Sequence, residues 1–132
     1  MSSSYFEVGG VRMKTSTGAV IWIGLVLVFL SGAANAQDYY GAIAFSKSTG
    51  QTGYSYDYSS RGGAEQAALN KCGENDCEIQ VWFQNSCGAL AQGGDGALGY
   101  SWAANNRSQA ESRALSECGS NCEVLAWACT TR

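Results

Sequence analysis

Gly41-Ala42-Ile43-Ala44 and Gly88-Ala89-Leu90-Ala91 are two copies of one short pattern, and they decide how the whole chain is interpreted. The segments that follow them also recur in the same order. Gly53-Tyr54-Ser55-Tyr56 returns as Gly99-Tyr100-Ser101-Trp102, and Cys77-Glu78 with Trp82 returns as Cys122-Glu123 with Trp127. Such ordered self-similarity indicates a duplicated supersecondary unit. The two repeats cover residues 40–86 and 87–132.

Each repeat has the pattern of strand, strand, helix and strand. Residues 40–46 and 52–58 have strand-like composition, and Tyr54, Tyr56 and Tyr58 alternate with polar residues as in a half-buried strand. The last strand of this repeat covers residues 77–84. The second repeat predicts strands at residues 87–91, 98–102 and 122–129, with a glycine-rich turn at residues 93–96.

Short helices precede the last strand of each repeat. Ser108 and Glu111 have the spacing of a capping box, and Gly62 with Glu65 takes these positions in the first repeat. Narrow stripes of small residues let each helix lie close to a sheet; they are Ala64, Ala67, Ala68 and Leu69, then Ala110, Ala114 and Leu115. Gly73 and Gly119 follow the helices, where a left-handed residue is favoured.

The predicted fold is α+β, built from a duplicated β-β-α-β unit. We expect a mostly antiparallel sheet of about six strands, with two short helices on one face, pseudo-twofold symmetry and disulfide staples. The apolar face of each last strand should pack under the helices; its residues are Ile79, Val81 and Phe83, then Val124, Ala126 and Ala128.

Residues 1–36 have the features of an export signal. Arg12 and Lys14 precede an apolar run over residues 19–30, and Ala34-Asn35-Ala36 resembles a cleavage site. Met13 is then the expected true start, and the mature domain is residues 37–132. The alternative is an uncleaved anchor, but the run is shorter than the roughly 20 residues that span a bilayer. We therefore expect a periplasmic or secreted protein with no membrane association after cleavage.

The composition excludes several classes of function. The chain is mildly acidic, with a net charge of −3 and no basic run, so nucleic-acid binding is not expected. It contains no histidine, which excludes Ser-His-Asp and Cys-His catalysis and histidine-containing metal sites. Asp95 and the segment at residues 74–76 lack the ligand spacing of a calcium loop. We expect no metal and no cofactor.

All six cysteines lie in the mature domain, where an oxidising compartment favours disulfides. Repeat symmetry predicts the local bridges Cys72–Cys77 and Cys118–Cys122. Cys87 and Cys129 have no counterpart in the other repeat, and they open and close strands that would be neighbours, so they should pair with each other. A four-thiolate zinc site fits the spacing only loosely.

The candidate binding residues are Trp82, Trp127, Glu78 and Glu123, which the strand period places on one face. Tryptophan rings beside carboxylates suit sugar stacking or a protein contact. The alternative is that Tyr54, Tyr56 or Tyr100 covers the tryptophans in a second small core. Arg61 and Arg107 could hold an anion near the helix N-termini, but solvated surface arginines are the favoured interpretation.

The combined motifs resemble the family known as domain of unknown function 4189. The resemblance rests on Gly-Ala-Ile/Leu-Ala, on the helices with Ala-Glu, Ala-Leu and Cys, and on Cys-Glu followed by Trp, and it covers residues 40–129. It implies a small exported bacterial domain and provides no catalytic residues.

Together these features favour a non-enzymatic binding module of the bacterial envelope or exterior. Its partner would be a protein, including an enzyme that it inhibits, or an envelope glycan. A small hydrolase acting on envelope glycans through Glu78, Glu123, Glu65 or Glu111 is the first alternative. A purely structural envelope component is the second.

Overall fold

The structure, a computed structural model, describes residues 5–8, 11–14 and 37–131, and the chain separates into one unit of residues 1–35 and another of residues 36–132. In the first unit, β1 (Tyr5–Val8) and β2 (Val11–Lys14) form an antiparallel pair. The apolar run and the cleavage site of the predicted export signal lie outside the described residues.

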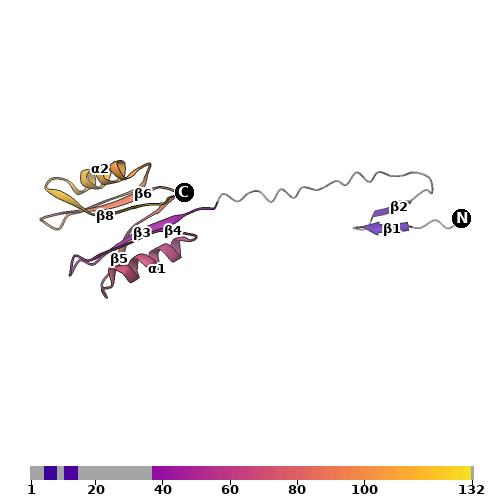
Figure 1. Ribbon diagram of the computed structural model, residues 1–132, viewed down its shortest axis with the longest axis horizontal. Helices are drawn as coiled ribbons and strands as arrows, with labels where there is room; N and C mark the ends of the chain where they lie inside the picture. Colours follow the sequence, from indigo (N-terminus) through magenta and orange to yellow (C-terminus); the bar gives the residue numbers. More distant parts are fainter. Residues whose placement is uncertain (1–4, 9–10, 15–36, 132) are drawn as a thin grey trace. The chain divides into compact units, whose positions relative to one another are not determined.

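The second unit contains the β-β-α-β order twice, as predicted (Figure 1). The first repeat consists of β3 (Tyr40–Phe45), β4 (Thr52–Tyr58), α1 (Arg61–Cys72) and β5 (Glu78–Gln84). The second consists of β6 (Cys87–Gly93), β7 (Leu98–Ala104), α2 (Arg107–Cys118) and β8 (Cys122–Cys129).

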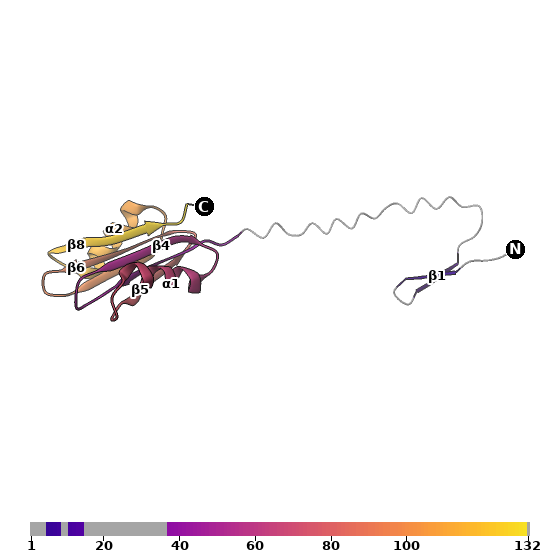
Figure 2. The ribbon, with the colours of Figure 1, turned by 60° about the horizontal axis from the view of Figure 1, so that its bottom comes forward.

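The six strands of the repeats are divided between two antiparallel sheets. Their strand orders are β4-β3-β5 and β7-β6-β8, so each repeat forms its own three-stranded sheet, with its first strand in the centre. The α+β class, the duplicated unit, the antiparallel strands and the disulfides are confirmed. The single six-stranded sheet is corrected, and so is the placement of both helices on one face. Figures 1 and 2 show α1 and α2 on opposite sides of the paired sheets.

The two faces of each central strand explain this arrangement. Ala42 and Ala44 of β3 are buried with Ala64 and Ala68 of α1, whereas Ile43 belongs to a cluster shared by both repeats. The buried members of that shared cluster are Ile43, Phe45, Val81, Phe83, Leu90, Ala126 and Ala128. Small residues therefore lie under the helices, and larger ones fill the space between the sheets.

The strand residues that we predicted under the helices are partly misplaced. Val81, Phe83, Ala126 and Ala128 face the opposite sheet, whereas Ile79 packs with the cluster beneath α1 and Val124 pairs with Ala91 of the cluster beneath α2. A period of two identifies an apolar strand face, but it does not identify what covers that face. Here the second repeat covers it.

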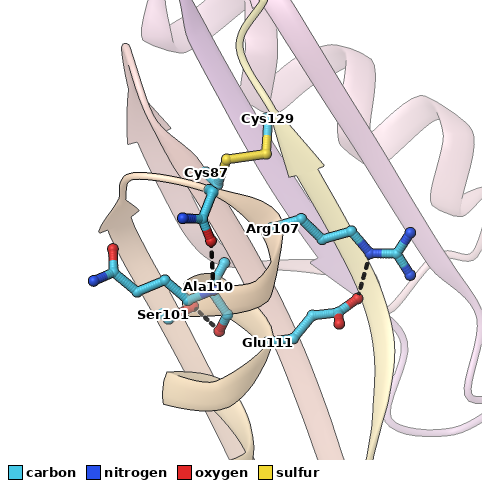
Figure 3. A network of polar contacts seen from close by, with 8 residues as sticks. Cys87, Ser101, Arg107, Ala110, Glu111 and Cys129 are labelled. Carbon is cyan, nitrogen blue, oxygen red and sulfur yellow. Dashed lines mark hydrogen bonds and ion pairs between the residues drawn. A yellow bond between two sulfur atoms is a disulfide. The ribbon is translucent and has the colours of Figure 1, made fainter.

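Each helix lies very close to the second strand of its repeat. Ser55 Oγ donates to the carbonyl of Ala64 at 2.6 Å, and Ser101 Oγ donates to the carbonyl of Ala110 at 2.6 Å. Ser101 and Ala110 are seen in Figure 3. Gly53 and Gly99 permit this approach, because a Cβ at either position would lie 2.1 Å from a helix carbonyl oxygen.

The helices begin earlier than predicted. The side chain of Ser60 accepts from the Gly63 N–H, and that of Asn106 accepts from the Gln109 N–H, so these residues are the N-caps. The predicted caps at Gly62 and Ser108 are wrong, since Arg61 and Arg107 already form the first turns. Gly73 adopts the predicted left-handed helical conformation, with φ of 73°, whereas Gly119, with φ of 104° and ψ of −140°, does not.

The three disulfides are those predicted from the sequence. Cys72–Cys77 and Cys118–Cys122 each join the end of a helix to the start of the next strand. Cys87 and Cys129 are directly opposite each other on β6 and β8, with Cα atoms 4.0 Å apart. This bridge ties the last strand to the centre of its sheet.

Asp76 should make the folding stability of the domain depend on pH in the acidic range. The Ser46 hydroxyl donates to Oδ1 at 2.6 Å and the Ser48 N–H donates to Oδ2 at 3.1 Å, and these bonds lower the pKa of Asp76 below its ordinary value of 3.8. Because the pKa of Asp76 is lower in the folded state than in the unfolded state, its carboxylate stabilises the fold at pH values above the unfolded-state pKa. That stabilisation is lost as the pH falls through the folded-state pKa.

Asp76→Asn should therefore lower the melting temperature at neutral pH, and the gap to the wild type should narrow as the pH falls below about 4. Thermal scans of both proteins from pH 2 to pH 7 measure this gap. A gap that stays constant over the range would contradict a role for the charged carboxylate.

Candidate functional site

Trp82 and Trp127 lie on the helix-covered faces of their sheets. Trp82 is paired with Ala42 and Trp127 with Ala89, and both alanines are buried in the clusters beneath the helices. Each tryptophan is at the edge of its sheet and remains 37% exposed. The indoles are therefore only half covered by the domain itself.

An arginine stacks on each tryptophan. The guanidinium carbon of Arg61 is 4.3 Å from the ring centroid of Trp82, and Arg61 Nε is 2.6 Å from Glu65 Oε1. The second repeat repeats this set, with Arg107 at 4.1 Å from Trp127 and at 2.7 Å from Glu111. Figure 3 shows the pairing of Arg107 with Glu111.

These contacts change the interpretation of four predicted residues. Glu65 and Glu111 are not capping-box residues; each pairs with the arginine one turn earlier. The side chains of Arg61 and Arg107 are more than half exposed, but one face of each guanidinium group is stacked on an indole ring. The sequence contained a signal for this set, because the Arg-x3-Glu spacing and the later tryptophan recur in both repeats.

Glu78 and Glu123 do not share a face with the tryptophans. Ile43 pairs with Val81 but Ala44 pairs with Ile79, so one residue is unpaired between them and the alternation reverses. Glu78 consequently pairs with Phe45, on the face opposite to that of Trp82. The same shift occurs in β8, where Glu123 pairs with Gln92. The predicted carboxylate–tryptophan pairs are therefore not formed.

The second strand of each repeat carries further exposed aromatic residues. Tyr54 pairs with Ile43 and Tyr100 with Leu90, so these rings lie on the faces that meet the opposite sheet. Tyr56 and Trp102 follow them by one strand period. The exposed fractions of Tyr54, Tyr56, Tyr100 and Trp102 are 44%, 46%, 43% and 57%. They line the edges of the paired sheets and do not seal the tryptophans in a second core.

Two grooves run between the edges of the two sheets. The β5–β7 groove has a volume of about 650 Å³, and Trp82, Tyr100 and Trp102 line it. The β4–β8 groove has a volume of about 480 Å³, and Tyr54, Tyr56 and Trp127 line it. Repeat symmetry relates the two sets of aromatic residues. Both grooves fall in the size range of small-ligand sites.

The β5–β7 groove also has polar lining residues. Gln80, Gln84, Asn85 and Ser86 line the β5–β7 groove. Asn85 is held in place, since its Nδ2 donates to Asp38 at 3.0 Å and its Oδ1 accepts from the Tyr39 N–H at 2.9 Å. Ser86 Oγ is buried without a hydrogen-bond partner in the described part of the chain. None of these four residues was singled out from the sequence, because uncharged polar residues in and just after a strand look like ordinary solvent-facing positions.

Family comparison agrees with the duplicated architecture. The model of the family described as Domain of unknown function (DUF4189) matches residues 40–129, from the first residue of β3 to the last of β8. The chain belongs to this family. The DUF4189 domain thus comprises both repeats, both sheets and all three disulfides.

Several mycobacterial proteins are similar to this DUF4189 domain. Protein Rv1269c of Mycobacterium tuberculosis and Protein Mb1300c of Mycobacterium bovis are each 48% identical over 58 residues. That segment is 44% of this chain and 45% of the relatives, so the match spans less than half of their length. The NMR structure of Rv1813c from Mycobacterium tuberculosis is also similar, with 32% identity and a TM-score of 0.55 over 70% of this chain and 75% of that one.

Two further observations concern the described residues. No group of three or more Asp, Glu or Cys side chains among them could hold a metal ion. Neither α1 nor α2, the helices that the structure describes, is long and apolar enough to cross a membrane.

Proposed function

We propose that this DUF4189 domain is an exported, disulfide-stabilised binding module of the bacterial envelope or exterior. The observation that carries the proposal is the set of six exposed aromatic residues at the edges of the paired sheets; they are Tyr54, Tyr56, Trp82, Tyr100, Trp102 and Trp127. Exposed aromatic surface costs solvation free energy, and its concentration in two grooves is typical of binding surfaces.

The state of the carboxylates supports binding over catalysis. Glu65 and Glu111 are each paired with an arginine, and Glu78 and Glu123 lie on strand faces away from the tryptophans. A carboxylate-based hydrolase would need two carboxyl groups facing one scissile bond.

Export is supported by the cysteines. All six form disulfides, which persist in oxidising compartments such as the periplasm and the extracellular medium. An inhibitory action on a partner enzyme is one form that binding could take, and the same experiment addresses it.

The experiment is affinity capture with the full chain, expressed in a bacterium with a C-terminal tag and recovered from its own envelope or medium. Its intact mass, with and without reductant, shows whether residues 1–36 have been removed and whether three disulfides have formed. The recovered protein is then incubated with envelope and culture-medium fractions, in parallel with Trp102→Ala and with the double variant Glu65→Gln/Glu111→Gln.

We expect the wild type and the glutamine variant to retain the same component and Trp102→Ala to lose it. Trp102 is the position chosen for the test because it is the most exposed of the groove aromatics, so its removal should leave the melting temperature nearly unchanged. A glutamine change at Glu65, Glu111, Glu78 or Glu123 that abolishes a turnover activity at unchanged melting temperature would favour the hydrolase instead. Equal capture by all variants would contradict a binding role for the groove.

A further inference from the structure

We infer that the β5–β7 groove binds a neutral, linear carbohydrate. The inference rests on the proposed binding function and specifies its ligand class and its site. Its first support is charge, because no Asp, Glu, Lys or Arg is among the residues that line the groove. A site for an anionic or cationic ligand would present the opposite charge.

One wall of the groove is aromatic. The rings of Tyr100 and Trp102 are 6.3 Å apart between centroids and inclined by 32°, and about half of each side chain is exposed. Two neighbouring rings tilted toward each other in this way form an angled platform on which the apolar C–H faces of successive sugar rings can lie. The phenol hydroxyl and the indole N–H remain available at the platform edges.

The opposite wall carries carboxamides. The side chain of Gln84 is exposed and makes no hydrogen bond within residues 37–131, and that of Gln80 makes only a 3.5 Å contact to the carbonyl of Glu78. A carboxamide offers two donors and an acceptor. Neighbouring sugar hydroxyls, each a donor and an acceptor, match that set without any charge.

Ser86 adds an independent observation. Its Oγ is buried without a partner, although the residue lines the groove. An unsatisfied buried hydroxyl destabilises the free domain. Rotation about χ1 moves this hydroxyl without moving the backbone, so a ligand hydroxyl in the groove can provide the missing partner.

The β4–β8 groove lacks the carboxamide side chains that line the β5–β7 groove. Repeat symmetry places Leu125 where β5 has Gln80, and it places the disulfide-bonded Cys129 where β5 has Gln84. The β4–β8 groove is also smaller, and Lys71 lies 5.3 Å from the ring of Tyr54. The aromatic residues are thus common to both grooves, whereas the carboxamides belong to β5 alone. The β4–β8 groove is therefore the internal control.

The test is an NMR titration of the ¹⁵N-labelled, oxidised, exported protein. The probes are cellohexaose, chitohexaose and maltohexaose, with an oligogalacturonate of similar length as the charged comparison. We expect a neutral hexasaccharide to shift the amide signals of β5 and β7 and the indole N–H signal of Trp102, in a saturable manner, and the oligogalacturonate to leave them unmoved.

Three variants test whether the carbohydrate binds in the β5–β7 groove. Trp102→Ala should weaken binding about tenfold, and Tyr58→Ala, at an exposed tyrosine that lines neither groove, should leave the affinity within about twofold. Ser86→Ala should weaken binding about threefold while leaving the melting temperature unchanged or raising it, because it removes an unsatisfied hydroxyl. A purely structural serine would lower the melting temperature instead.

The inference is overturned if none of the three neutral hexasaccharides binds, if the shifts map to β4 and β8, or if the oligogalacturonate binds equally well. Trp102-dependent capture of a protein without carbohydrate binding overturns the ligand class and leaves the proposed binding function standing. Concentration-dependent dimerisation through Trp102, seen by sedimentation, overturns it in favour of a second copy of the chain. Absence of any Trp102-dependent capture removes both proposals.

Discussion

Gly99→Ala should remove about 3 kcal/mol or more of the free energy of unfolding, a large part of what a small domain has. A Cβ at this position would lie 2.1 Å from the carbonyl oxygen of Ala114 and 2.2 Å from the amide nitrogen of Cys118. Both are backbone atoms of α2, so no side-chain rotation can relieve the clash. The helix would have to move away from β7 and open the alanine contacts beneath it.

Urea unfolding of the oxidised protein measures this effect. Gly53→Ala should behave in the same way, because its Cβ would meet the carbonyl of Ala68 in α1. Gly62→Ala is the matched control, since nothing lies within 4 Å of its Cβ and alanine favours a helix, so stability should rise by about 0.5–1 kcal/mol. A Gly99→Ala protein within about 1 kcal/mol of wild type would contradict the close packing of α2.

Removal of the long disulfide should be the second large effect. Cys87 and Cys129 are 42 residues apart, whereas the partners of the local bridges are 5 and 4 residues apart. In the chain-entropy model the long loop contributes about 4 kcal/mol and each short loop about 2 kcal/mol. Cys87→Ala/Cys129→Ala should therefore destabilise the domain about 2 kcal/mol more than Cys118→Ala/Cys122→Ala.

Thermal and urea unfolding of the two double variants, with peptide mapping under non-reducing conditions, provide the measurement. The mapping verifies that the remaining four cysteines keep their partners, which the comparison requires. Equal destabilisation by both double variants would show that the restraint acts on the folded state, since loop length would then have no influence. Cys72→Ala/Cys77→Ala serves as a repeat of the short-loop control.

Much of the fold could be predicted because the chain is duplicated. Matching residues in two repeats fixed the element order and the cysteine pairing, and the observed β4 and β8 have the predicted bounds. The division into two sheets could not be predicted, since Ile43 and Leu90 are apolar whether a helix or a second sheet covers them. The helix starts were missed because Arg61 and Arg107 were placed before the helices, which hid the caps at Ser60 and Asn106.

The candidate site was predicted only in part. Trp82 and Trp127 do lie beside a groove, but the unpaired residue in β5 and in β8 reverses the strand alternation and separates them from Glu78 and Glu123. The position of a β-bulge cannot be predicted from the hydrophobic pattern of a strand. The recurring Arg-x3-Glu spacing and tryptophan mark these residues in the sequence, but the stacking of Arg61 on Trp82 depends on the packing of α1 against its sheet.

The cluster shared by the two sheets bears on the origin of the chain. Ile43, Phe45, Val81 and Phe83 of one repeat are covered by Leu90, Ala126 and Ala128 of the other. A single ββαβ unit would present that whole face to water, so an ancestor with one unit would have needed a second copy to fold. Fusion of the two genes would have placed both halves of this interface in one chain, and thereafter the two grooves were free to diverge.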